Sequence, residues 1–199
     1  MLRAALDSLN RGDRKRVTET ARMDTVLDHL DTAIKKYLTS IDIDALDDMD
    51  HRRLSEILAF TTNLEHAGDI VEKSLMPLAA KRIKRGVSFS EGSRQEIRDM
   101  LDRLTSNARA AAAVFMTEDL RAARQLLGEK EVFREIEART TEEYFGPARV
   151  GRPENIEMSK LLLDIVRDLK RVNAHLAAAA YPVLEGRGEL LPSRLKHDE

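Results

Sequence analysis

The sequence has no cysteine and no tryptophan, and it is poor in aromatic residues, glycine and proline. The absence of cysteine excludes a disulfide-stapled fold, a thiolate metal site, a cysteine nucleophile and thiol redox chemistry. Aromatic residues make up 4% of the chain, and only 9 Gly and 5 Pro occur in 199 residues. Because strand-rich folds need β-branched and aromatic residues and frequent turn signals, this composition predicts long helices.

A long apolar run and a marked charge excess are also absent. The longest apolar stretch, 176–184, is about half of the ~20 residues needed to cross a bilayer, and the N-terminus lacks the apolar core of a signal peptide. The formal net charge is −2, which argues against a dedicated nucleic-acid binder. We therefore expect a soluble chain from a reducing compartment, the cytosol.

Apolar residues instead recur at helical spacing along most of the chain. One stripe, which predicts a core-facing helix of a bundle, consists of Met23, Val26, Leu30, Ala33, Tyr37 and Ile41. A second stripe runs from Leu54 to Leu78 and ends in a basic run and Gly86, a typical helix stop.

Capping residues and breaks predict the remaining helices. Ser90 and Ser93 are candidate N-caps for a helix through Met116, and 117–119 caps a helix that ends near Phe145. The stretch 146–153 contains Gly and Pro and predicts a break before a last helix at about 155–185.

The two halves of the chain form a weak internal repeat. A displacement of about 105 residues places Pro77 on Pro182 and Leu64 on Leu169, with the same helix order in each half. The sequence therefore predicts an all-α fold of two tandem three-helix bundles, residues 1–88 and 89–186, followed by a flexible tail at 187–199. The first helix, 2–10, is truncated relative to its counterpart at 91–116, and we expect that further sequence precedes residue 1.

Carboxylates are paired at positions i and i+4 beside the apolar stripes. The pairs are Glu65 with Asp69 and Asp24 with Asp28 and, in the second half, Glu131 with Glu135 and Asp164 with Asp168. Such pairs on facing helices form oxygen-rich sites for Mg²⁺, Ca²⁺, Mn²⁺ or Fe. In a chain with 34% charged residues they also arise by chance on solvated faces, so both interpretations stay open. His66 and His175 are weaker ligand candidates, and no phosphate loop or nucleophile motif is present.

Residues 63–73, Asn-Leu-Glu-His-Ala-Gly-Asp-Ile-Val-Glu-Lys, resemble the signature of PhoU domains. That signature, close to Leu-Glu-Arg-Ile-Gly-Asp-His-Ala, lies in the third helix of each three-helix repeat. Leu64, Glu65, Gly68 and Asp69 match it, whereas His66 replaces the usual arginine. The second copy at 168–175 is degenerate, since Lys, Asn and Ala replace the expected Glu, Gly and Asp. In this it is similar to the PhoU-like domain of bacterial sodium/phosphate cotransporters.

The resemblance implies a regulatory domain in phosphate homeostasis rather than an enzyme. It implies a divalent or iron-type metal ion on the acidic signature residues: by position Glu65 and Asp69, then Asp24 and Asp28, with Asp164 and Asp168 as the remaining pair of the second repeat. It also implies, as a partner, a membrane transport domain upstream in the same polypeptide at the cytoplasmic side of the inner membrane, and it allows a homo-oligomer without nucleic acid. The alternatives are a free-standing PhoU-type regulator and a carboxylate-metal hydrolase or oxidase.

Overall fold

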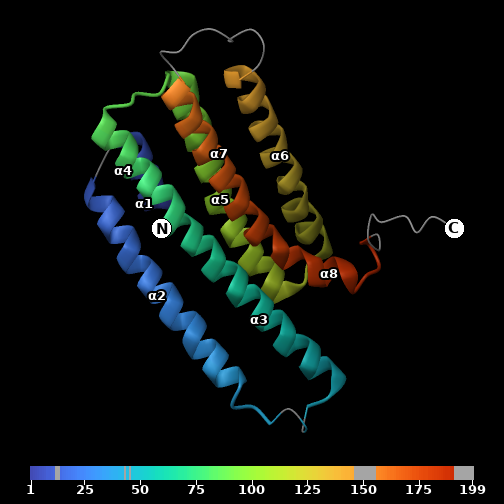
Figure 1. The fold of residues 1–199 in the computed structure, drawn as a ribbon. Helices are drawn as coiled ribbons and strands as arrows, with labels where there is room; N and C mark the ends of the chain where they lie inside the picture. Colours follow the sequence, from blue (N-terminus) through green and yellow to red (C-terminus); the bar gives the residue numbers. More distant parts are fainter. Residues whose placement is uncertain (12–13, 43, 45, 146–155, 191–199) are drawn as a thin grey trace, which may run out of the picture.

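The computed structural model describes residues 1–11, 14–42, 44, 46–145 and 156–190, and within these ranges the chain forms helices and no strand (Figure 1). The first unit contains α1 (Leu2–Arg11), α2 (Arg14–Leu38) and a long rod made of α3 (Asp48–Asp69), the π-helical segment η2 (Ile70–Leu75) and α4 (Met76–Arg85). The second contains α5 (Glu91–Thr117), α6 (Leu120–Phe145) and a rod made of α7 (Ile156–Ala177), the 3-10 segment η5 (Ala178–Ala180) and α8 (Tyr181–Glu185). This confirms the all-α fold of two three-helix units with a short first helix.

Local signals place most helix ends where the sequence predicts them. The Ser90 hydroxyl accepts a hydrogen bond from Ser93 N at 3.1 Å, and the Asp119 carboxylate accepts one from Ala122 N at 2.6 Å. Gly86 ends α4 with φ 64°, a left-handed conformation that glycine adopts without steric cost. The predicted break at 146–153 and residues 191–199 of the predicted tail lie outside the described residues.

The two repeat-related prolines each follow a departure from regular α-helix. Pro77 comes after the π-helical segment, in which Met76 N donates to Val71 O, and Pro182 comes after the 3-10 segment. Proline lacks the N–H that would continue the helical ladder and its ring crowds the preceding turn, so the chain widens before one proline and tightens before the other.

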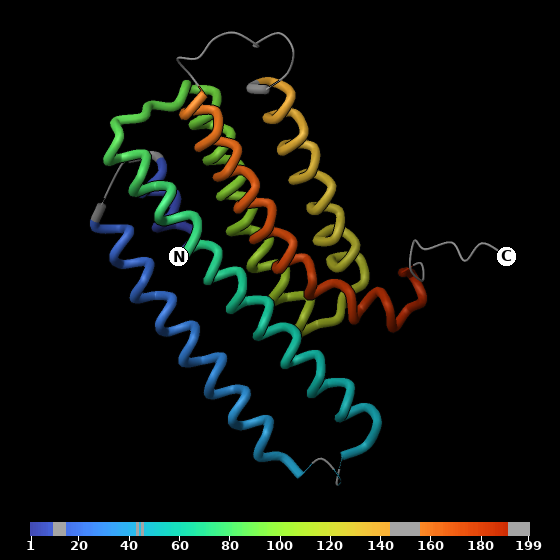
Figure 2. Tube along the Cα trace, viewed as in Figure 1, coloured from blue at the N-terminus to red at the C-terminus, as the bar shows by residue number. Residues whose placement is uncertain are grey.

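The two units share one hydrophobic core, and α7 lies at its centre. This helix packs against α3, α5 and α6 (Figure 2). Its Leu162, Ile165 and Leu169 are completely buried, and the same core cluster includes Leu9 of α1 and Phe133 of α6. The cluster thus joins residues from both repeats. None of the described helices is both long enough and apolar enough to span a membrane.

The apolar stripe on α2 does not face the core, and here the sequence prediction was wrong. Val26, Leu30 and Tyr37 are 58, 55 and 68% exposed, whereas Thr20 and Asp24 on the neighbouring face are buried. The physical reason is the length of α1, which has 10 residues against 27 in α5. No described helix therefore covers the outward face of α2 along its C-terminal half.

Candidate metal centre

Three aspartates from two helices converge where α2 crosses α3. Asp24 and Asp28 of α2 and Asp69 at the end of α3 each offer a carboxylate oxygen, and these oxygens all lie within 4.8 Å of one another. Asp24 is only 5% exposed, and its Oδ1 atom has no hydrogen-bond partner among the described residues. A buried carboxylate oxygen without a partner is costly, and a bound cation or a proton would relieve this cost.

Gly68 allows the two helices to approach closely enough to form this cluster. A Cβ atom at position 68 would lie 2.4 Å from Leu27 Cδ2 and 3.0 Å from Asp24 Oδ1. A side chain at position 68 would have to displace the Leu27 side chain and crowd the Asp24 carboxylate. The glycine of the signature is therefore explained by the close packing that places Asp24 beside Asp69.

The cluster concentrates negative charge at a site that is partly buried from solvent. Burial and, to a smaller extent, the charges of Asp28, Asp69 and Glu72 together raise the pKa of Asp24 to about 6, while Lys73 opposes the rise. Lys73 forms an ion pair with Asp69. The hydrogen bond from Lys73 to Asp69 in turn raises the pKa of Lys73. One ammonium group thus balances part of the charge of several carboxylates.

This donor set fits a hard cation. Carboxylate oxygens from separate helices are the ligands that Mg²⁺, Ca²⁺ and Mn²⁺ prefer, and iron also accepts them. A bound cation would supply the partner that Asp24 Oδ1 lacks and would offset the repulsion among the three aspartates. The residues present therefore fit a metal ion, which Asp24, Asp28 and Asp69 would hold.

The remaining predicted residues of the first repeat lie next to this cluster rather than in it. Glu65 lies one turn before Asp69, and its Oε2 atom is 3.5 Å from His66 Nε2. Glu72, which the sequence analysis did not single out, adds charge close to Asp24. Glu72 lies in η2, three residues after Asp69, a spacing that the i, i+4 pattern does not include.

The two candidate histidines contact each other, and neither of them belongs to the cluster of three aspartates. The rings of His66 and His175 form an edge-to-face contact with centroids 5.3 Å apart. His175 Nδ1 donates to Asn63 Oδ1 at 2.9 Å, and burial, together with the positive charges of His66 and Arg171, lowers the pKa of His175. This contact links α3 to α7 and favours a neutral imidazole at position 175.

In the second repeat basic residues replace the aspartates. The positions that correspond to Asp24 and Asp28 are Lys130 and Arg134. Lys130 Nζ donates to Tyr181 Oη at 2.6 Å, and Arg134 pairs with Glu131. Neither of these positions therefore offers a carboxylate to a cation.

The remaining predicted pair, Asp164 and Asp168, does not join a metal-type cluster among the described residues. Asp168 accepts a hydrogen bond from Arg171 at 2.9 Å. Burial nevertheless raises the pKa of Asp168, against the opposing effect of Arg171.

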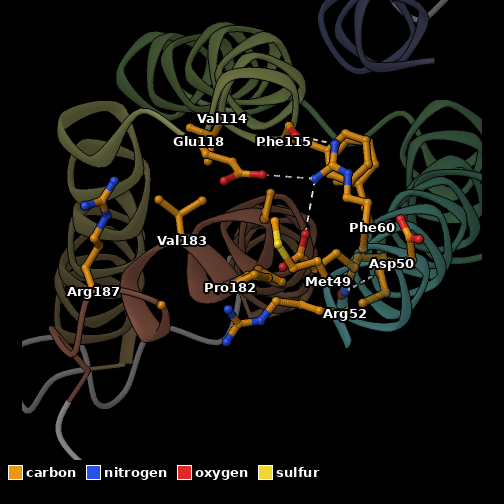
Figure 3. A pocket seen from close by; sticks show the side chains of 17 residues that line it. Met49, Asp50, Arg52, Phe60, Val114, Phe115, Glu118, Pro182, Val183 and Arg187 are labelled. Carbon is orange, nitrogen blue, oxygen red and sulfur yellow. Dashed lines mark hydrogen bonds and ion pairs between the residues drawn. The ribbon is translucent and has the colours of Figure 1, made fainter. Parts of the chain in front are cut away.

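A separate cavity of about 450 Å³ lies between the start of α3, the end of α5 and the η5–α8 segment (Figure 3). Arg53 forms part of its wall: its guanidinium lies 4.4 Å from the Phe115 ring centre, donates to Phe115 O at 3.1 Å and lies between Glu56 and Glu118. Phe60 stacks on Phe115 at 4.2 Å. The described lining residues include no serine, histidine or lysine, so the wall offers no nucleophile or general base of those types.

The chain is similar in sequence to a domain family and to several longer proteins. Residues 1–74 match the PhoU domain family. The chain is 32% identical over 154 residues to the "Putative inorganic phosphate export protein YjbB" of Salmonella typhimurium, an alignment that covers 77% of this chain and 28% of that protein. It is 31% identical over 180 residues to the protein of the same name from Escherichia coli K12, covering 90% of this chain and 33% of that protein. The chain therefore spans about a third of the length of these curated relatives.

Comparison with solved structures addresses the fold. The crystal structure of PhoU from Pseudomonas aeruginosa superposes with a TM-score of 0.83 at 17% identity, covering 94% of this chain and 88% of that chain. The N-terminal unit, which holds the acidic cluster, thus matches the PhoU domain family, and the chain as a whole has the fold of a PhoU protein.

Proposed function

We propose that this chain is a non-catalytic regulatory unit of phosphate homeostasis that acts on inorganic phosphate transport. The observation that supports it most strongly is the 31% identity, over 90% of this chain, to a protein named for inorganic phosphate export. The match of residues 1–74 to the PhoU domain family supports the same conclusion.

Two arrangements would give this function. The unit would act as a free-standing PhoU-type regulator, or as the cytosolic domain of a membrane phosphate transporter of the sodium/phosphate cotransporter type. The free-standing regulator has at least as much support, because this chain covers 88% of a PhoU chain of the same fold and the relatives described above are named for export. In either arrangement its partner is a membrane phosphate transporter at the cytoplasmic face.

The proposed regulatory ligand site is the acidic cluster of Asp24, Asp28 and Asp69. A divalent or iron-type cation there would join α2 to α3 across the Gly68 contact. Because these side chains come from two different helices, binding would stabilise their packing and would stiffen the first unit. This would give the regulator a cation-dependent conformation to present to the transporter.

The test is phosphate flux in the source organism. Deletion of the gene is expected to change [³²P]phosphate uptake or efflux and the intracellular phosphate level. The wild-type gene should restore both. A gene with Asp24→Asn and Asp69→Asn should not, whereas one with Asp164→Asn and Asp168→Asn should restore them, because that pair lies outside the cluster. Unchanged flux and phosphate level after deletion would overturn the proposal.

A further inference from the structure

Exposed apolar side chains gather on one face of α2. We call this the α2 surface and define it by Met23, Val26, Leu30, Ala33 and Tyr37. The large residues among them are 39 to 68% exposed, and their spacing places them on one side of the helix. The other large exposed apolar residues of the described ranges, Met49, Met116 and Ile156, lie on other helices. Contiguous exposed apolar surface marks an interaction site more often than a scattered residue does.

The second repeat shows what covers the equivalent face. The N-terminal half of α5 lies antiparallel along α6, and ion pairs mark its edges: Arg103 donates to Glu129 at 3.0 Å, and Arg139 pairs with Glu96. Glu129 is the repeat equivalent of Met23. The apolar side chains of that half of α5 are fully buried in the core. An amphipathic helix thus completes the second bundle.

The first repeat lacks this half-helix within the described residues. The 10 residues of α1 span roughly 15 Å, while the 27 residues of α5 span roughly 40 Å at 1.5 Å per residue. In Figure 1, α2 and the N-terminal half of α3 run past the other helices as a two-helix hairpin. The α2 surface lies on this hairpin, beside the position that a longer α1 would fill.

Charge on the border of the α2 surface restricts the chemistry of its occupant. Arg22, His29 and Lys36, which we call the basic edge, are exposed and seven residues apart, so they share one side of α2. Within the described ranges, the side chains of these three residues form no hydrogen bond or ion pair. Two copies packed antiparallel through their α2 surfaces would place one basic edge against the other, which is unfavourable. A helix with an acidic edge would pair with it.

We propose that the α2 surface is the docking site for one amphipathic helix from outside these 199 residues. This helix lies antiparallel to α2, as α5 lies on α6, and it places apolar residues on the α2 surface and acidic residues toward the basic edge. It completes the first three-helix bundle. The inference uses no ligand of the acidic cluster and does not depend on the proposed role in phosphate transport.

The probe is a fluorescein-labelled synthetic peptide of about 17 residues, the length by which α5 exceeds α1, with leucine on one face and glutamate along its edges. Fluorescence anisotropy should show saturable binding to the whole chain. Leu30→Glu should weaken binding at least ~10-fold, and Lys36→Glu should weaken it about threefold and reduce its salt dependence. Met116→Glu is the matched control, because Met116 is 73% exposed but lies outside the α2 surface. The affinity of this variant for the peptide should equal that of the wild-type chain.

Circular dichroism and melting should be the same for Leu30→Glu and wild type, since Leu30 is 55% exposed. A peptide with lysine in place of glutamate should bind more weakly than the acidic peptide. Equal affinity of Leu30→Glu and Met116→Glu, or no binding at about 1 mM peptide, would overturn the proposal. So would a wild-type dimer in sedimentation that Leu30→Glu converts to monomer, because the occupant would then be a second copy.

Discussion

Asp24 is the residue whose environment departs most from that of a surface carboxylate. It is buried, one oxygen lacks a partner, and its pKa is raised to about 6 from an unfolded value of 3.8. The folded protein therefore holds a proton on Asp24 at pH values where the unfolded chain has released it. Without metal, this residue's contribution to the free energy of unfolding is present below about pH 4 and is lost as the pH rises through about 6.

This pH dependence of the free energy of unfolding predicts the effect of Asp24→Asn in the presence of EDTA. At pH 7.5 the variant should be more stable than wild type by up to about 3 kcal/mol, since about two pKa units at 1.4 kcal/mol each are involved. At pH 4 the two proteins should be nearly equal. Urea denaturation at both pH values measures the difference, and the exposed Asp102→Asn serves as the control. A wild-type advantage at pH 7.5, or a difference that does not depend on pH, would contradict the assigned burial.

At the scale of elements, the close contact between α2 and α3 depends on Gly68. A matched pair of glycines tests this, because a Cβ atom at Gly68 would meet Leu27 and Asp24, whereas one at Gly128 of α6 would meet nothing within 4 Å. Gly128→Ala should raise the free energy of unfolding by up to about 1 kcal/mol through helix propensity. Gly68→Ala should lower it by about 1–2 kcal/mol through crowding.

Thermal or urea unfolding of both variants in EDTA is the measurement. The informative quantity is the difference between the two changes in free energy of unfolding. The gain in helix propensity from glycine to alanine is common to both substitutions and cancels in this difference. If Gly68→Ala stabilised the protein as much as Gly128→Ala, the close packing of α2 on α3 would not be required.

The sequence predicts the elements well because their signals are local. Caps at Ser90 and Asp119, the stop at Gly86 and the paired prolines each act within a few residues. The prolines did not reveal that one segment is π-helical and the other 3-10. That difference depends on how each rod packs against its own neighbours.

The candidate site was only partly predictable because it joins two helices. Spacing along one helix identifies Asp69 with Glu65, and Asp24 with Asp28, as pairs on a face. Which pairs meet is decided by the register of α2 on α3, and the structure selects Asp69 for the cluster and leaves Glu65 one turn away. The exposed α2 stripe has a similar cause, since apolar spacing predicts burial only where a third helix is present to cover it.

At the scale of the whole molecule, the two repeats share a fold but differ in charge at the equivalent place. The first presents Asp24, Asp28 and Asp69, and the second has Lys130 and Arg134 at the equivalents of Asp24 and Asp28, with Lys170 paired to Glu137. Because a lysine ammonium cannot ligate a cation, the second repeat offers none of the ligands on which the first depends. If the proposed cation binds, it is therefore expected at the first repeat alone.

The most direct test is the stoichiometry of Mn²⁺ binding to the purified chain by isothermal titration calorimetry. A single ion per chain is expected, because within the described residues the first repeat alone gathers aspartates from two helices. Binding should be lost in Asp24→Asn and in Asp69→Asn and retained when Asp164 and Asp168 are both replaced by Asn. Two ions per chain, or a single ion that still binds to Asp24→Asn with wild-type affinity, would contradict it.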